Sequence, residues 1–294
     1  MDAVITYVNG NDPVWKADYE RATNIPIMQK RFRDWGTLKY LLRGIEEYMP
    51  FIKNVYLVVS HTSQVPQWAD TSNLKIVLHK DIIPSEYLPT FNANPIEMNL
   101  HRIPGLDEEF VYFNDDMFPV SPCSPEDFFK NGKVVKGLKR HLFSFGMFKK
   151  ICRNSDSLAR RAAGLQPSCI YLRPQHTPSP MFKSQCEKLY SAFPEEIGET
   201  SSHKTRTGKD LNQYLFLEYI YYMDLLEDRR ISSKHISVAM ATEDSLKDAI
   251  LNSSFKMLCI NDVRLSEEKF ERLRSVIVES FETKFPRLSK FELH

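Results

Sequence analysis

An acidic triplet follows a short apolar run in the first half of the chain. Residues 110–113 read Phe-Val-Tyr-Phe, a pattern typical of a buried β-strand, and Asn114, Asp115 and Asp116 come directly after them. Carboxylates at the carboxyl end of a central strand can hold a hard divalent cation, which can neutralise a diphosphate. The triplet also suits a plain turn, because Asn and Asp side chains hydrogen-bond to their own backbone.

A second apolar run ends in the same kind of residue. Residues 256–260 lead into Asn261 and Asp262. Because the carboxyl ends of parallel strands meet at one edge of a sheet, both strand ends are predicted to face one site. The candidate metal ligands are therefore Asp115, Asp116, Asn261 and Asp262.

Polar and basic residues near the amino terminus suit a nucleotide. Asn9 and Asp12 lie in the loop after residues 3–8, where an α/β sheet usually meets a nucleotide, but GxGxxG and P-loop motifs are missing. Arg31 and Arg33 lie two residues apart, so in an extended segment both point to one side and can grip phosphate oxygens. The alternatives are an Asn-Gly turn and a surface cluster of ion pairs.

Residues 88–106 concentrate hydrogen-bonding groups between two prolines, as a platform for a sugar would. The amide and acidic side chains suit hydroxyls and the basic ones suit phosphate, which gives as candidates Asn92, Asn94, Glu97, His101 and Arg102. Alternatively, Glu97 and His101, at positions i and i+4, pair on a short helix.

His176 is the best candidate for a general base. Neighbouring prolines hold its segment extended, and a neutral imidazole can take a hydroxyl proton near neutral pH. Arg206 lies in a basic loop that can cover a diphosphate, just ahead of an aromatic stretch. A polar surface histidine and solvated charge are the alternatives for these two residues.

Alternating strands and helices are predicted to hold these residues. Apolar runs at 3–8, 55–60, 74–78 and 110–113 predict strands, and the periodicity of 38–48 predicts a helix, which together favour a mostly parallel α/β sheet. Helices are also predicted at 211–228 and 267–281. We expect one catalytic domain over residues 1–294, with an α/β core at 1–120 and about 210–294 and a helical and loop insertion at about 121–209.

Composition limits the class of protein. With 39 Lys and Arg against 38 Asp and Glu among 294 residues, the net charge is +1, which argues against nucleic acid as a partner. Five cysteines without CxxC spacing argue against a disulfide framework and a structural zinc site. No charged-then-apolar leader opens the chain, so a cytoplasmic location is expected. Residues 211–226 are too polar to span a membrane, although their aromatic edge leaves contact with a membrane surface as a minor option.

The ordered motifs resemble the Stealth family, the bacterial capsular polysaccharide phosphotransferases whose catalytic region is similar to that of eukaryotic N-acetylglucosamine-1-phosphotransferase. Tyr7 stands where the family usually has Trp. The match spans nearly the whole chain, in blocks at residues 4–13, 31–34, 88–92, 100–106, 112–116, 175–178, 193–196, Arg206 and 259–262.

The resemblance implies a Rossmann-like, glycosyltransferase-A-like nucleotide-sugar fold and a hexose-1-phosphate transferase, one of the phosphotransferases for other substituted phosphate groups. Such an enzyme moves a sugar 1-phosphate from a UDP-sugar to a hydroxyl of a growing polysaccharide and releases UMP. It also implies Mg²⁺ or Mn²⁺ as cofactor. A hexosyltransferase of the same fold, releasing UDP, and a non-catalytic glycan- or nucleotide-sugar-binding protein are the alternatives.

The resemblance also suggests roles for the candidate residues. Asp116 with Asn261 or Asp262 would hold the metal, Arg206 and Arg102 would meet the phosphate charge, and His176 would take the acceptor proton. Asn9, Asp12 and Arg33 would help to seat UDP. A lipid-linked acceptor and peripheral attachment to the inner face of the cytoplasmic membrane are expected.

Overall fold

A five-stranded sheet lies at the centre of the computed structural model, which describes residues 1–24, 27, 32–261 and 265–293. The strand order is β10-β4-β1-β2-β3, and all neighbours are parallel except β10 and β4. The strands are β1 (Asp2–Thr6), β2 (Val55–Val59), β3 (Leu74–Leu78), β4 (Glu109–Asn114) and β10 (Ser179–Phe182). The α/β class predicted from the sequence is confirmed.

Burial on both faces explains why these strands read as continuous apolar runs. Every residue of β2 is buried, as are four of the five residues of β1. The register places Thr6 beside Asn114, and Thr6 also pairs with Val58 on the other side. The carboxyl ends of β1, β2 and β4 therefore reach the same edge of the sheet.

A second, three-stranded sheet continues from the end of β4. It consists of β5 (Met117–Pro119), β12 (Ser233–Ser237) and β13 (Met257–Asn261), in the order β12-β13-β5. Asp115 and Asp116 form the turn between β4 and β5. The acidic turn is thus the direct covalent connection between the two sheets.

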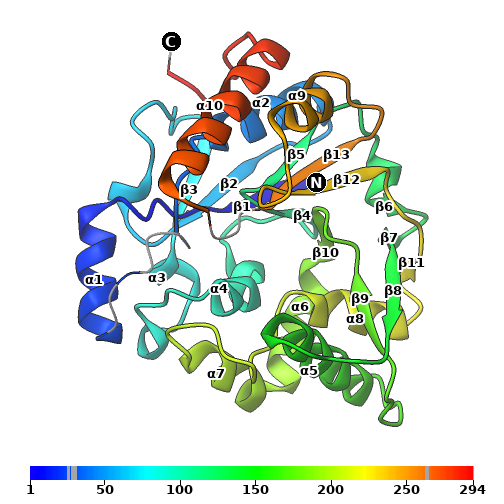
Figure 1. The fold of residues 1–294 in the computed structure, drawn as a ribbon. Helices are drawn as coiled ribbons and strands as arrows, with labels where there is room; N and C mark the ends of the chain where they lie inside the picture. Colours follow the sequence, from blue (N-terminus) through cyan, green and yellow to red (C-terminus); the bar gives the residue numbers. More distant parts are fainter. Residues whose placement is uncertain (25–26, 28–31, 262–264, 294) are drawn as a thin grey trace.

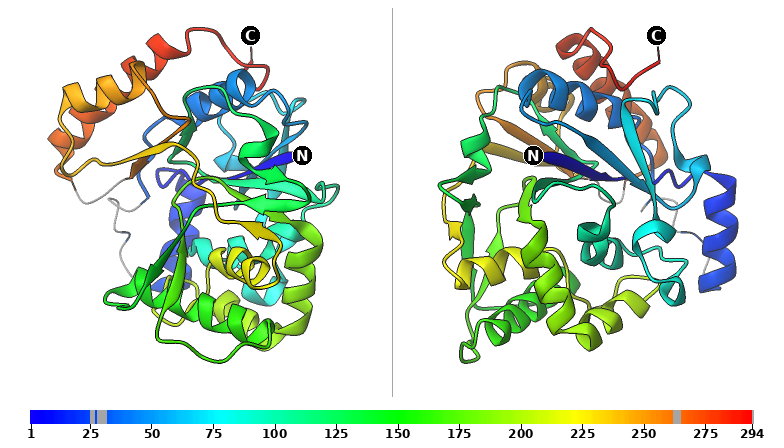
Figure 2. Two further views of the ribbon diagram at one scale, coloured as in Figure 1. Left: turned by 90° about the vertical axis from the view of Figure 1, so that its right-hand side faces the viewer. Right: turned by 180° about the vertical axis from the view of Figure 1, so that it is seen from behind.

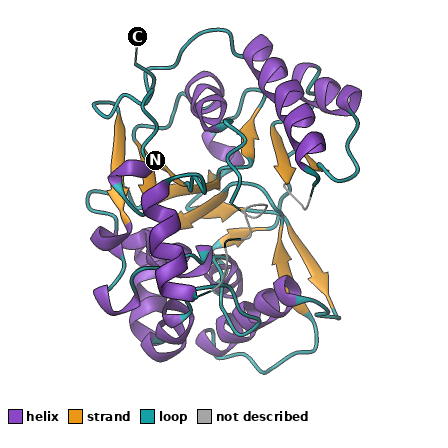
Figure 3. Ribbon diagram, turned by 60° about the vertical axis from the view of Figure 1, so that its left-hand side comes forward, coloured by secondary structure: helices purple, strands orange, loops and turns teal. Residues whose placement is uncertain are grey.

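Helices cover both sides of the strands. Figure 3 shows the strands in the middle of the molecule and helices above and below them. In Figure 1, one group lies above the main sheet: α2 (Leu38–Tyr48), α9 (Glu243–Leu251) and α10 (Glu267–Lys284). A second group lies below it: α4 (Ala93–Asn99), α5 (Met147–Ala162), α6 (Lys183–Ala192), α7 (Pro194–Ser202) and α8 (Tyr214–Tyr222). Both views of Figure 2 show the same separation.

Two further helices flank the amino-terminal part of the sheet. These are α1 (Pro13–Thr23), at the side of the molecule in Figure 1, and the short α3 (His79–Ile82) directly after β3. The helices predicted at 38–48 and 267–281 are confirmed as α2 and α10. Ser266 caps α10 by accepting a hydrogen bond from the Lys269 N–H, and Glu267 and Glu268 in the first turn complement the helix dipole.

The middle of the chain contains more strand than its sequence indicates. Besides its helices, it forms β6 (Phe129–Lys130), β7 (Lys133–Val135), β8 (Leu138–His141) and β9 (Tyr171–Pro174), while β11 (Leu226–Glu227) pairs with β7. β10, from the same region, joins the main sheet as an edge strand. Pro180 fits there, because an edge strand tolerates a residue without an N–H.

Helix α8 is shorter than predicted. Its periodicity predicted residues 211–228, but the helix starts at Tyr214, whose N–H donates a hydrogen bond to Asn212 Oδ1 at 3.3 Å. Asp224, with φ of 57°, adopts the left-handed conformation that ends helices. Because Phe216 and Tyr219 are buried, the option that this stretch rests on a membrane surface is wrong. Across the described residues, no helix has the length and apolarity needed to cross a bilayer.

Helix α8 also carries a buried carboxyl group. The Glu218 side chain is fully buried, and neither of its oxygens has a hydrogen-bond partner within the described residues. Burial, with a smaller contribution from Asp156, raises the pKa of Glu218 well above its usual range. The folded chain therefore keeps a proton that the unfolded chain loses as the pH rises above the ordinary glutamate range.

We expect Glu218→Gln to become increasingly more stable than the wild type as the pH rises. Proton binding by the folded state makes wild-type stability fall from the ordinary glutamate pKa upward, by at most about 1.4 kcal/mol per pH unit, and the substitution removes this loss. Urea unfolding at pH 5 to 9 measures the difference. Glu187→Gln, on an exposed carboxylate of α6, is the control. A pH-independent difference between Glu218→Gln and wild type would contradict the expectation.

Candidate functional site

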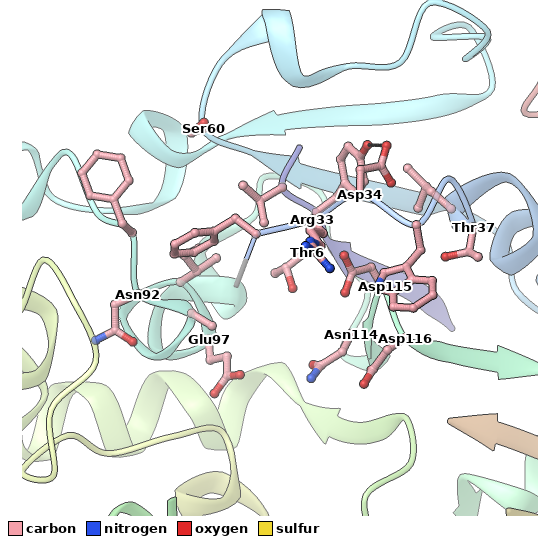
Figure 4. A pocket seen from close by; sticks show the side chains of 18 of the residues that line it. Thr6, Arg33, Asp34, Thr37, Ser60, Asn92, Glu97, Asn114, Asp115 and Asp116 are labelled. Carbon is pink, nitrogen blue, oxygen red and sulfur yellow. Dashed lines mark hydrogen bonds between the residues drawn. The ribbon is translucent and has the colours of Figure 1, made fainter. Parts of the chain in front are cut away.

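A cleft of about 370 Å³ opens where β1 and β4 end. Figure 4 shows Asn92 and Glu97 on one side of it and Asn114, Asp115 and Asp116 on the other. Polar side chains from both sheets and from the helices below line the cleft, among them Thr6, Arg33, Asp34, Asn92, Glu97, Asn114, Asp115, Asp116, Arg206 and Asn261. The structure thus brings together seven residues that the sequence selected.

The acidic turn presents oxygen atoms that the protein itself leaves unpaired. The Oδ1 atoms of Asn114 and Asp116 are buried, and neither has a hydrogen-bond partner in the described part of the chain. The Ile260 N–H donates to the Asp116 carbonyl oxygen at 3.0 Å, which ties the turn to β13. Buried acceptors without partners are costly, so they mark a place for a cation or for ligand donors. An all-oxygen donor set fits Mg²⁺ or Mn²⁺.

His176 lies beside the acidic turn. Its Nε2 is 3.8 Å from Asp116 Oδ2, and the imidazole is partly exposed. The buried ammonium of Lys136 holds the following residues by donating to the carbonyl oxygens of Thr177 at 2.8 Å and Pro178 at 2.9 Å. The predicted base and the predicted metal-binding acid are therefore neighbours in the fold.

Two neighbours of His176 were not among the predicted site residues. The rings of His235 and His176 lie 5.7 Å apart, and the Cys259 thiol donates to Asp116 Oδ2 at 3.4 Å. Burial, followed by the charge of Asp116, raises the pKa of the Cys259 thiol well above its usual range, which keeps it a donor. His235 stands opposite Cys259 in the β12–β13 pair, a long-range pairing without a sequence motif.

Two arginines each present a buried N–H group that has no hydrogen-bond partner among the described residues. These groups are Arg33 Nη1 and Arg206 Nε, and both side chains line the cleft. The Arg33 guanidinium lies 4.4 Å from the centre of the Phe270 ring, and its Nη2 donates to Glu267. Free guanidinium N–H groups held in this way suit phosphate oxygens.

The two asparagines predicted to meet a sugar instead donate hydrogen bonds to Asp210. Its fully buried carboxylate accepts hydrogen bonds from Asn92 Nδ2 at 2.7 Å, Asn94 Nδ2 at 2.9 Å and Thr207 Oγ1 at 2.6 Å. These bonds fix the loop that carries Arg206. Asn92 still lines the cleft. Asn94 is not among the residues that line it, and its hydrogen bond to Asp210 helps to hold the Arg206 loop.

Glu97 occupies the wall of the cleft opposite the acidic turn. It accepts hydrogen bonds from the Gln213 N–H at 3.0 Å and from Tyr112 Oη at 3.5 Å. The alternative prediction that Glu97 pairs with His101 is wrong, because the His101 ring packs against Tyr190. Burial raises the pKa of Glu97 to about 7, against the lowering effects of Gln213, Arg206 and Tyr112. Its charge therefore changes close to neutral pH.

For the UDP-sugar donor that the family resemblance implies, we expect the affinity to rise about fivefold between pH 6 and pH 8, since a charged Glu97 accepts a stronger hydrogen bond from a sugar hydroxyl than a neutral one does. In Glu97→Gln the affinity should stay flat over this range. Calorimetric titration with the donor at pH 6, 7 and 8, without acceptor, measures both proteins. If the variant retains the wild-type pH dependence, the ionisation belongs to another group.

Asn9 and Asp12 lie in a neighbouring cleft and not in this one. The Asp12 Oδ1 caps α1 by accepting from the Val14 N–H, and its Oδ2 accepts from Ser63 and Gln64. Burial favours the neutral acid, but these hydrogen bonds hold the pKa of Asp12 below its usual value. Asp12 is thus satisfied by the protein, because the loop needs it to start the helix.

His101 and Arg102 also point away from the cleft. The short turn after α4 directs both side chains towards Tyr190 of α6, with ring centres 5.0 Å apart for His101 and a guanidinium-to-ring distance of 5.8 Å for Arg102. Arg102 is exposed. The structure therefore does not bring these predicted phosphate ligands to the site. The predicted residues Arg31 and Asp262 lie outside the described residues.

Two family models match the chain. Residues 31–136 match Stealth protein CR2, conserved region 2, and residues 175–224 match Stealth protein CR3, conserved region 3. The first match includes Arg33, Glu97 and the acidic turn, and the second includes His176 and Arg206. Both matched regions thus contribute side chains to the cleft or its edge.

Relatives match over the whole chain. The capsular polysaccharide phosphotransferase WcwK of Streptococcus pneumoniae is 31% identical, with 100% of this chain and 99% of that protein covered. The receptor polysaccharide phosphotransferase WefC of Streptococcus oralis is also 31% identical, with the same coverage. Among solved structures, mouse xyloside xylosyltransferase 1 superposes loosely, with a TM-score of 0.41 and 13% identity over 88% of this chain and 97% of that one.

Proposed function

The chain belongs to the Stealth family and is a phosphotransferase, and we propose that it transfers a sugar 1-phosphate from a UDP-sugar to a hydroxyl of a surface or capsular polysaccharide, releasing UMP. The observation that carries the proposal is the set of unpaired groups in one cleft. Two guanidinium N–H groups and two buried acceptor oxygens are without partners in the described residues, with His176 beside them. A phosphate-transfer site needs this combination of charges.

In the proposed reaction, the acceptor hydroxyl attacks the β-phosphorus of the donor. The bond from the acceptor oxygen to phosphorus forms, the bond from phosphorus to the bridging oxygen breaks, and UMP leaves. His176 takes the hydroxyl proton, and Asp116 at 3.8 Å stabilises the imidazolium that results. Arg206 and Arg33 face the phosphate oxygens, which gain stabilisation from donors already in place.

Asn114, Asp115, Asp116 and Asn261 would hold Mg²⁺ or Mn²⁺, since all four line the cleft and offer oxygen ligands. When bound, such an ion neutralises charge on a diphosphate. The two carboxylates of this donor set would hold the cation, and the arginines would add direct contacts to the phosphate oxygens. Glu97 would accept a hydrogen bond from a sugar hydroxyl.

The proposal includes the wider setting of the enzyme. The acceptor is a polysaccharide, lipid-linked during its growth, and the protein works as one catalytic domain in the cytoplasm, attached peripherally to the inner face of the membrane. The glycosyltransferase-A-like manner of holding a nucleotide-sugar belongs to the same proposal. The order of strands and the cleft at their carboxyl ends support it.

The released nucleotide tests the proposal. Purified protein is incubated with Mg²⁺ or Mn²⁺, a panel of UDP-sugars and oligosaccharide acceptors, and the nucleotide is identified by chromatography. UMP together with a phosphodiester-linked product supports sugar-1-phosphate transfer. UDP would indicate the alternative hexosyltransferase reaction, and donor binding without turnover would indicate a non-catalytic binding protein.

A further inference from the structure

Residues 142–148, the apolar loop, expose more large apolar side chains than a soluble surface normally does. Five of the seven residues are large, apolar and exposed: Leu142 (47%), Phe143 (64%), Phe145 (79%), Met147 (50%) and Phe148 (42%). This segment runs from the end of β8 into the first turn of α5, at the lower end of the molecule in Figure 1 and far from α9 and α10. None of these side chains lines the proposed active-site cleft.

The fold holds the apolar loop in this exposed conformation. Tyr171 Oη donates to the Phe143 carbonyl oxygen at 3.0 Å, and Arg153 Nη2 donates to the Leu142 carbonyl oxygen at 3.0 Å. The rings of Phe143 and Phe145 stack with centres 5.9 Å apart. The aromatic side chains thus stay together at the surface because their backbone is anchored from below.

A second apolar segment lies next to the loop. Arg153 Nη2 also donates to the Cys169 carbonyl oxygen, which ties residues 165–170 to the apolar loop. Leu165 and Ile170 in this segment are each 43% exposed. The exposed apolar surface therefore extends across two neighbouring segments of the chain.

Positive charge surrounds this surface. Between residues 139 and 173 the chain has eight Lys and Arg and one acidic residue, a formal charge of +7 in a protein whose total is +1. The one acid, Asp156, is buried and paired with Arg160, and Arg161 is paired with Glu196 from outside this stretch. Lys139, Arg140 and Lys150 are exposed, and none has a carboxylate within 4.0 Å in the described part of the chain. The region is therefore strongly cationic at its surface.

We propose that the apolar loop and its flanking cations dock onto the surface of an anionic lipid bilayer. The Phe and Leu side chains enter the boundary between headgroups and acyl chains, while the Lys and Arg side chains meet headgroup phosphates. A second copy of the chain fits less well, because a symmetric contact would bring the exposed cations of two such surfaces together. This inference extends the peripheral attachment in the proposed function and names the surface responsible.

Flotation with lipid vesicles tests the proposal without any donor or acceptor, so its failure is separate from failure of the transferase assignment. We expect the protein to float with vesicles of 30 mol% phosphatidylglycerol in phosphatidylcholine, and much less with phosphatidylcholine alone. Phe143→Ser with Phe145→Ser should lower partitioning at least about tenfold. Lys149→Ala with Lys150→Ala should lower it about fivefold for each cation removed.

Further variants separate insertion from general adhesion. Met240 is 89% exposed elsewhere on the surface, so Met240→Ser should float as the wild type does. In Phe145→Trp, the fluorescence emission of the new tryptophan should shift to the blue on vesicles. Brominated acyl chains should quench it. The double Phe variant should release nucleotide with a soluble acceptor at the wild-type rate.

Three results would overturn the proposal. One is absence of wild-type flotation with anionic vesicles, and another is undiminished flotation of the double Phe variant. The third is a dimer in sedimentation velocity that the double Phe variant loses, since the surface would then contact a second copy.

Discussion

Asp116→Ala is expected to lower sugar-phosphate transfer by at least about 10³-fold, the largest effect of any single substitution in the cleft. Asp116 contributes an unpaired buried oxygen, an acceptor for the Cys259 thiol and a carboxylate 3.8 Å from His176. Its removal therefore takes away charge, cation ligand and imidazole partner together. Release of UMP under saturating donor and divalent cation measures the loss.

Asp116→Asn separates charge from shape in the same experiment. It should lose activity nearly as fully. Its unfolding temperature should not fall below that of the wild type, because a carboxylate with one buried and unpaired oxygen costs stability. Mn²⁺ binding, followed by electron paramagnetic resonance, should weaken in both variants. Asp244→Ala, on an exposed carboxylate in α9, serves as the control. Unchanged Mn²⁺ affinity in Asp116→Ala would remove this residue from the metal site.

The second large effect is expected for His176→Ala. A positioned general base typically contributes about 10² to 10⁴-fold, so turnover should fall by that factor. The Michaelis constant for the donor should stay within about threefold, since His176 lies at the edge of the cleft and not among the groups assigned to the diphosphate. Steady-state kinetics with varied donor separates the two parameters.

A matched histidine makes the result specific. His61 is partly exposed and pairs with Asp18 at 2.8 Å, and His61→Ala should keep wild-type turnover. Full turnover in His176→Ala would show that another group takes the acceptor proton. A higher Michaelis constant with unchanged turnover would instead place His176 in donor binding.

Local patterns predicted the elements that are buried and regular. The bounds of α2 and β3 agree with the sequence-based prediction at both ends, because their apolar spacing follows one period without interruption. β6 and β11, with two residues each, are too short for a pattern, and β10 contains Pro180. These strands exist because distant partners pair with them, which is information that local propensity lacks.

The site shows the same difference between local patterns, which the sequence reveals, and long-range contacts, which it does not. Asp116, His176, Arg33 and Arg206 were predicted from motifs and meet at one place. The sequence could not distinguish Asn92 and Asn94, which support the Arg206 loop through Asp210, from residues that meet a ligand. His235 was missed because only the pairing of β12 with β13 brings it near His176.

The connection of two sheets by the acidic turn limits how far this enzyme can be shortened. β4 needs β1, which begins at Asp2, and β5 needs β13, which ends at Asn261. A fragment with only the two matched regions, 31–136 and 175–224, would lack both partner strands and leave β4 and β5 with open edges, which favour aggregation. Asp116 would also lose its contacts with Cys259 and Ile260. A catalytic fragment of this chain must therefore retain at least residues 2–261, because the strands that complete the fold also hold the acidic turn.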